Sequence, residues 1–204
     1  QLARRCQILG MSTTIHQVPD REVIEVIGSA DHPRLNLIAR WDVGADRTVH
    51  FNAHYDVVPS SGKWKFGDPF EPGIAAGALY GRGAGDMKGS IAALLMAVEA
   101  LRASDLKPEF NIECSFTADE ETGGELGAGW VVRKGLVDAD YAIVCEGAAG
   151  TQVGCGHNGV LWLDIELKGK AVHASRPDQG INAFEAMAGT VQGLKDYKIG
   201  LDDE

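Results

Sequence analysis

Four short motifs of acidic residues and histidine, placed where predicted strands end or a predicted helix begins, constrain the fold of this 204-residue chain most strongly. They are His54-Tyr55-Asp56, Gly85-Asp86-Met87-Lys88-Gly89, Asp119-Glu120-Glu121 and Cys145-Glu146-Gly147. In α/β proteins, sites form outside the carboxyl ends of the strands, where segments distant in sequence meet. The four motifs therefore predict one shared site.

Strands and helices are predicted to alternate along the first three quarters of the chain. Apolar patterns predict strands over 48–53, 110–117 and 141–145, and helices over 87–102 and 127–134. This order predicts an α/β fold with a mainly parallel sheet flanked by helices. Before it, the sequence predicts a helix over 2–9 and strands over 22–27 and 34–40.

The pattern changes after Gly156, which predicts a second unit. Apolar residues alternate over 161–168, as in a strand with one buried face, and 182–195 has the pattern of an amphipathic helix. We expect two domains, 1–154 and 155–204. One strand and one helix cannot bury a core alone, so the second domain is expected to be part of a larger α+β unit.

Composition excludes several classes of function. The formal net charge of −10 argues against nucleic-acid binding, which requires a basic face. No run of 18 apolar residues occurs, so no membrane span is expected. The four cysteines form no C-x-x-C pair, and Cys114 and Cys145 lie in apolar runs that predict buried thiols, typical of a reducing, cytoplasmic compartment. The sequence contains neither a P-loop nor a G-x-S-x-G motif.

Each motif alone has an ordinary explanation. His54 and Asp56 could be a surface pair, Asp86 could cap the helix that follows it, and 119–121 could be a solvated acidic turn. Together, one imidazole and several carboxylates predict an open catalytic site for two divalent metals, with zinc, cobalt or manganese as candidates. Metal-assisted hydrolysis is the chemistry that this site predicts.

Four stretches of the chain resemble the M20 metallopeptidase family, nearest to its acetylornithine deacetylase and succinyl-diaminopimelate desuccinylase branch. The stretches are His54-Tyr55-Asp56-Val57-Val58-Pro59, Tyr80-Gly81-Arg82-Gly83-Ala84-Gly85-Asp86-Met87-Lys88-Gly89, Thr117-Ala118-Asp119-Glu120-Glu121-Thr122-Gly123 and Gly169-Lys170-Ala171-Val172-His173-Ala174-Ser175. They occur in the family's order and span about residues 50–187. The resemblance implies a zinc-dependent exopeptidase-like fold followed by part of a small lid and dimerisation domain.

The resemblance also implies a role for individual residues. The implied metal ligands are His54, Asp86, Glu121 and Glu146, with Asp86 bridging two zinc ions. Asp56 is implied to orient His54, and Glu120 to be the general base. In the lid, His173 is implied to polarise the scissile carbonyl in a partner subunit's site, and Asn182 to lie near the substrate.

The expected activity is hydrolysis of an amide bond in an N-acyl amino acid or small peptide by a homodimer. Family members carry a further metal-binding histidine near their C-terminus, so this chain is expected to be an N-terminal fragment whose own activity is in question. Two alternatives stay open. One is a glycosidase that uses paired carboxylates, and the other is a truncated, non-catalytic relative that only binds metal or dimerises.

Overall fold

The computed structural model describes residues 1–204 except 105, 148–151, 157–158, 160 and 203–204. In it the chain divides into two units, Gln1–Gly154 and Cys155–Glu204. The four acidic motifs all belong to the first unit, and His173 and Asn182 to the second.

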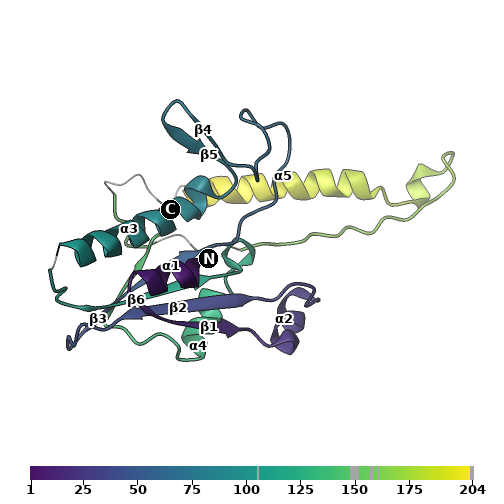
Figure 1. Ribbon diagram of the computed structural model, residues 1–204. Coiled ribbons are helices and arrows are strands. Elements are labelled where there is room, and N and C mark those ends of the chain that lie inside the picture. Colours follow the sequence, from purple (N-terminus) through teal and green to yellow (C-terminus); the bar gives the residue numbers. More distant parts are fainter. Residues whose placement is uncertain (105, 148–151, 157–158, 160, 203–204) are drawn as a thin grey trace. The chain divides into compact units, whose positions relative to one another are not determined.

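The first unit is built on a five-stranded sheet with the order β1-β2-β6-β3-β7 (Figure 1). The strands are β1 (Ser12–Gln17), β2 (Leu35–Trp41), β3 (Thr48–His54), β6 (Asn111–Thr117) and β7 (Tyr141–Val144). β3 pairs in parallel with both β6 and β7, whereas β2 runs antiparallel to β1 and β6. The α/β fold is confirmed, and the sheet is mixed because its two N-terminal strands add antiparallel pairings.

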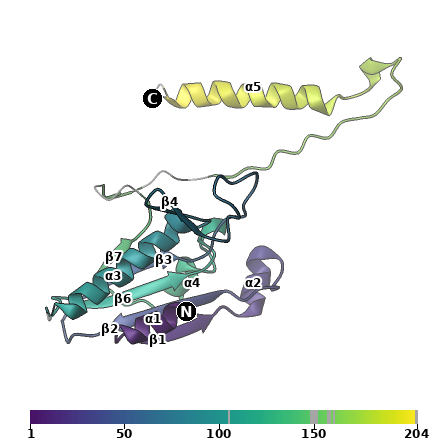
Figure 2. The same ribbon diagram turned by 45° about the horizontal axis from the view of Figure 1, so that its top comes forward.

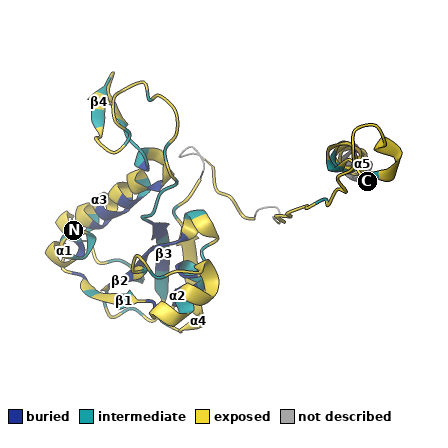
Figure 3. Ribbon diagram, turned by 90° about the vertical axis from the view of Figure 1, so that its right-hand side faces the viewer, coloured by how far each residue is buried: buried dark blue, intermediate teal, exposed yellow. Residues whose placement is uncertain are grey.

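Helices cover both faces of this sheet, which explains why the central strand β6 is buried on both sides (Figures 1 and 3). Helices α1 (Leu2–Ile8) and α3 (Gly89–Ala103) pack on one face, against Ile112, Cys114 and Phe116. Helices α2 (Asp20–Ile27) and α4 (Ala128–Arg133) contribute Val23, Trp130 and Val131 to the core on the other face.

Helix α3 is held on the sheet by one apolar stripe, in agreement with its predicted spacing. The buried residues of α3 are Ile91, Leu94, Leu95 and Val98. Each fully buried aliphatic side chain of this size contributes roughly 1.5–3 kcal/mol. This packing fixes the N-terminal end of α3, and with it the Asp86 segment, relative to the sheet.

A polar network joins β3 to β6 on the opposite face. The two ring nitrogens of His50 lie 2.8 Å from Glu113 Oε1 and 2.8 Å from Ser115 Oγ, and Asn52 donates to Ser115 Oγ at 2.8 Å. Arg40 on β2 donates to the second oxygen of Glu113. Burial acts to raise the pKa of Glu113, but the hydrogen bonds from His50 and Arg40 outweigh it, and the pKa lies below its ordinary value.

Near the N-terminus, one predicted element was wrong and one element was missed. The strand predicted over 22–27 is helix α2, which begins after Pro19 and ends at Gly28 in the left-handed conformation. Strand β1 was not predicted. In contrast, the strands predicted over 34–40, 48–53, 110–117 and 141–145 all occur, with no end shifted by more than one residue.

The proline- and glycine-rich segment between β3 and α3 forms a small hairpin and a tight turn. Strands β4 (Gly73–Ala75) and β5 (Ala78–Tyr80) pair antiparallel, outside the main sheet (Figure 2). The chain then enters α3 through a kinked turn, η1 (Ala84–Lys88), which contains Asp86. The segment therefore carries Asp86 back to the end of β3.

The second unit contains a 3-10 turn, η3 (Pro177–Gln179), and helix α5 (Ala183–Asp202) in its described residues. A single bridge joins Lys170 to Ile181. The strand predicted over 161–168 does not form, because this run pairs with no other described segment. Among the helices of the described residues, none has the length and apolar character that crossing a membrane requires.

Candidate metal centre

The parallel strands bring three of the four motifs to the same edge of the sheet. His54 ends β3 and pairs in register with Thr117 at the end of β6. The chain continues from β6 into the 3-10 turn η2 (Glu120–Thr122), and from β7 into Glu146 two residues after Val144. Because β6, β3 and β7 are adjacent and point the same way, these side chains converge, as the sequence predicted.

The imidazole of His54 is the centre of this cluster, and its side chain is only 1% exposed. Its Nε2 atom lies 3.0 Å from Asp86 Oδ1, 3.3 Å from Glu146 Oε2 and 3.7 Å from Glu120 Oε2. The three carboxylates are partly exposed, at 63%, 35% and 50% respectively. Water and small molecules can therefore reach one side of the cluster, while the sheet closes the other.

Several carboxylates lie close together around the single imidazole of His54, and their charges shift the pKa values of the cluster. Burial acts to lower the pKa of His54, but the charges of Glu146 and Asp56, with the Asp86 hydrogen bond, outweigh it and raise the pKa. Burial raises the pKa of Glu120 and of Glu146, and neighbouring carboxylates act in the same direction. The cluster therefore favours additional positive charge.

Asp56 orients the acidic turn more directly than it orients His54. Its two carboxylate oxygens accept hydrogen bonds from the backbone amides of Glu120 and Glu121, at 3.3 and 3.1 Å. Asp56 Oδ1 also lies 3.3 Å from His54 Nδ1, yet this nitrogen makes no hydrogen bond. Asp56 is thus adjacent to His54, as predicted, and also serves the turn.

Asp86 does not cap α3, because that helix begins at Gly89 and has no side-chain cap. Its backbone is non-helical within η1, and its carboxylate points to His54. The neighbouring Met87 is buried, and its sulfur accepts a hydrogen bond from the backbone amide of His54 at 3.1 Å. The η1 turn is thereby tied to the end of β3.

The arrangement meets the requirements of a metal site. Among the described residues, two sets of donor atoms lie within 4.8 Å of one another: His54 with Glu120 and Glu146, and His54 with Asp86 and Glu121. One imidazole with several carboxylates suits zinc and other divalent first-row metals, and differs from the thiolate-rich sets of structural zinc sites. The two sets share His54 and together contain five of the six side chains that the sequence placed at this site.

Among the described residues, the side chains of His173 and Asn182 form hydrogen bonds with their near neighbours in the sequence. The Nδ1 atom of His173 lies 2.8 Å from Ser175 Oγ and accepts the Ser175 backbone amide at 3.2 Å. Asn182 caps helix α5, since its Oδ1 accepts the backbone amides of Phe184 and Glu185. The roles of both residues at the metal centre stay predictions.

Two residues beside the cluster received no role from the sequence. Lys88 is close enough to Asp56, Asp86 and Glu121 for their charges to act on its ammonium. Burial nevertheless lowers the pKa of this ammonium. Asp119 is buried directly before the two glutamates. The motif contained a signal that could have singled out Asp119. Three adjacent carboxylates repel one another, so a buried one among them needs a partner of opposite charge.

This chain is similar to known proteins in both sequence and fold. The profile of peptidase family M20/M25/M40 matches residues 50–200. Succinyl-diaminopimelate desuccinylase 1 of Alteromonas mediterranea is 37% identical over 82% of this chain and 45% of its own length. Acetylornithine deacetylase of Pasteurella multocida is 36% identical over 81% of the chain and 42% of its own length.

Among solved structures, human carnosine dipeptidase 1 superposes with a TM-score of 0.54 and 28% identity, over 70% of this chain and 30% of that protein. The chain spans less than half the length of the two curated relatives. The profile match covers most of the chain, and the histidine and acidic motifs lie within it. The chain therefore belongs to the M20/M25/M40 peptidase family.

Proposed function

We propose that this chain carries the metal centre of a hydrolase that cleaves an amide bond in an N-acyl amino acid or a small peptide. The observation that carries the proposal is the convergence of Asp86, Glu120 and Glu146 on the buried Nε2 atom of His54. The names of the relatives, a desuccinylase and a deacetylase, support removal of an acyl group. A glycosidase finds no support in this family.

The residues that would hold two divalent ions are His54, Asp86, Glu121 and Glu146. Zinc is the first candidate, and cobalt and manganese suit the same donors. When bound, such ions supply Lewis-acid polarisation of a carbonyl and lower the pKa of water. The carboxylates that crowd His54 supply the compensating negative charge.

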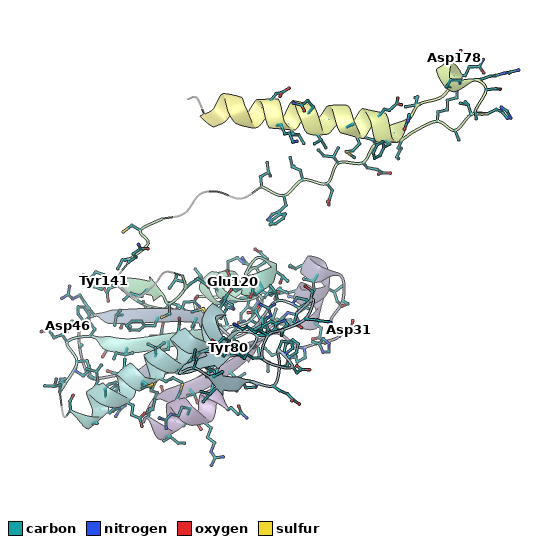
Figure 4. All side chains as sticks on the ribbon, turned by 90° about the horizontal axis from the view of Figure 1, so that it is seen from above. Asp31, Asp46, Tyr80, Glu120, Tyr141 and Asp178 are labelled. Atoms are coloured by element: carbon teal, nitrogen blue, oxygen red, sulfur yellow. The ribbon has the colours of Figure 1, made fainter. Side chains whose placement is uncertain are left out.

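Glu120 is the proposed general base. Its carboxylate is half exposed and its Oε2 atom lies 3.7 Å from His54 Nε2, so it can contact both a water molecule and the substrate. Figure 4 labels Glu120 on the first unit. Glu120 would take a proton from the attacking water and return that proton to the leaving amine. Asp56 holds the backbone of Glu120 through its amide, which limits the movement of the base between the two transfers.

The second unit is proposed to complete the site in a homodimer. His173 would donate a hydrogen bond from Nε2 to the carbonyl oxygen as negative charge develops there. Its Nδ1 already accepts the Ser175 amide, so a neutral ring carries its proton on Nε2. Asn182 would contact the substrate through its amide nitrogen, because its oxygen caps α5. A cytoplasmic location is proposed together with this activity.

The proposal predicts that Glu120→Gln abolishes turnover while metal stays bound. In the natural full-length protein, hydrolysis of acetyl-, succinyl- and aminoacyl-substrates should fall by at least about 10²-fold, the usual size of general-base catalysis. Metal content per chain should not change. Glu125→Gln is the matched control, since Glu125 is an exposed glutamate of the same segment that pairs with Arg133.

Full activity in the Glu120→Gln variant would refute the role of the base. A chelator should remove the activity of the wild-type protein, and added zinc should restore it.

Because the chain spans less than half the length of its relatives, a second function is a metal-binding or dimerising module without catalysis. Metal-loaded protein that cleaves none of the three substrate types would favour this second function.

A further inference from the structure

We propose that Asp119 is the positioning residue of the metal centre: its buried carboxylate holds the turn that presents Glu120 and Glu121. The inference rests on the proposed function, because it assigns Asp119 a purpose at that metal site. Asp119 is 3% exposed, and it belongs to neither of the two donor sets of the described residues. It therefore acts on the site only through its neighbours.

The backbone of Asp119 adopts a conformation that the surrounding contacts must maintain. Its φ of 71° and ψ of 10° lie in the left-handed region, which residues with a side chain rarely adopt. The residue lies two positions after the end of β6 and directly before the η2 turn. This left-handed step redirects the chain from the strand into the turn.

The carboxylate of Asp119 supplies the contacts that maintain this conformation. Its Oδ1 accepts the hydroxyl of Thr122 at 2.7 Å, and its Oδ2 accepts the backbone amide of Leu126 at 3.0 Å. The guanidinium of Arg34 lies 3.5 Å from Oδ1. Both oxygens are thus used within one loop, and Arg34 neutralises the buried charge.

Asn36 on β2 holds the same loop from the sheet. Its side-chain oxygen accepts the amide of Ala118 at 3.1 Å, and its nitrogen donates to the carbonyl of Leu126 at 3.0 Å. The side chain is fully buried. Asn36 therefore fixes the two ends of the loop, and Asp119 fixes the turn between them.

The turn is consequently held from two sides. The carboxylate of Asp56 accepts the amides of Glu120 and Glu121, while that of Asp119 binds the residues that follow them. A shift of the turn would move both glutamates relative to His54. Outer groups that orient metal ligands typically change metal affinity 10–100-fold when they are removed.

The test is cobalt binding by the 204-residue chain, followed by the visible absorption of Co²⁺ and by thermal unfolding. In Asp119→Asn, an NH₂ group replaces one of the two oxygens that accept from the Thr122 hydroxyl and the Leu126 amide. Asp119→Gly removes the carboxylate, but glycine adopts the left-handed backbone without cost. Both variants should bind cobalt about 10–100-fold more weakly. Their Co²⁺ bands should also change in shape, because the ligands are displaced.

Val131→Ala is the control for a loss of stability alone, since Val131 belongs to the core of the same sheet face and to neither donor set of the described residues. It should lower the melting temperature and leave the cobalt affinity and spectrum unchanged. Thr122→Val removes one hydrogen bond to Asp119 and should weaken cobalt binding several-fold. This milder variant decides the question if the Asp119 variants do not fold.

Wild-type affinity and spectrum in Asp119→Gly or Thr122→Val would overturn the positioning role while leaving the proposed function intact. An equal loss of affinity in Val131→Ala would also overturn it, because stability alone would then explain the effect. Failure of the wild-type chain to bind cobalt would overturn the proposed metal centre and, with it, this inference.

Discussion

Gly127 shows how little space the chain has beside the acidic turn. A Cβ atom at this position would lie 1.8 Å from the carbonyl oxygen of Ala118, the residue before Asp119. The carbonyl oxygen belongs to the backbone and cannot turn away as a flexible side chain could. Any larger residue at Gly127 must therefore displace the backbone at the end of β6. The small residue is needed here for close approach of two segments, not for an unusual φ.

We expect Gly127→Ala to destabilise the fold by about 1–3 kcal/mol, the usual cost of overpacking. Gly73→Ala is the control, because a Cβ at Gly73 meets nothing within 4 Å, and its effect should stay within about 0.5 kcal/mol. Urea unfolding measures both changes. Equal stability of the two variants would show that the segments separate without cost.

At the scale of elements, the pairing of β3 with β6 is reinforced by the buried network of Glu113, His50 and Ser115. Replacing Glu113 with Gln should cost about 1.5–3 kcal/mol at neutral pH, since hydrogen bonds to a charged group are lost. Burial alone would raise the pKa of Glu113, but His50 and Arg40 lower it below 4.5. The stabilisation is therefore present above pH 4.5 and is lost as the pH falls through the lowered pKa.

The stability difference between wild type and Glu113→Gln should therefore shrink as the pH falls below 4.5. Denaturant unfolding at a series of pH values measures this difference. Glu109→Gln, at an exposed glutamate just before β6, serves as the control and should show no such dependence. A difference that stays constant down to low pH would mean that the charge of Glu113 does not stabilise the pairing.

The elements that sequence patterns identified correctly are those whose burial follows one period. The four spaced apolar residues of α3 are buried, and β6 is apolar on its inner face. Helix α2 was mistaken for a strand because Val23, Ile24, Val26 and Ile27 form a short run of β-branched residues, although their spacing is helical and only Val23 is buried. The run 161–168 alternates like a strand, but alternation cannot supply the partner that a strand needs.

The site was predictable to the same extent. Residues with acidic or imidazole groups at strand ends could be named from the sequence, because parallel topology gathers them at one edge. The hydrogen bonds of Asp119 and the left-handed φ behind them could not be predicted, since they depend on loop closure. The capping of α5 by Asn182 was also missed, although Asn is a preferred residue at that position.

At the scale of the whole molecule, the cluster is a concentration of negative charge in a chain that already carries a net charge of −10. A metal that binds the folded chain alone should stabilise it, by about 2.7 kcal/mol at a concentration 100 times the dissociation constant. We expect zinc to raise the melting temperature, and EDTA to reverse this. His54→Ala should remove most of the increase, whereas the exposed-site control His32→Ala should keep it.

A zinc-dependent increase of the same size in His54→Ala would place the stabilising metal elsewhere. The most direct measurement is anomalous X-ray scattering at the zinc edge from zinc-soaked crystals of this chain. The account predicts strong peaks within about 2.0–2.2 Å of His54 Nε2 and of the carboxylates of Asp86, Glu121 and Glu146. Zinc peaks only at other sites, with none within coordination distance of His54, would contradict it.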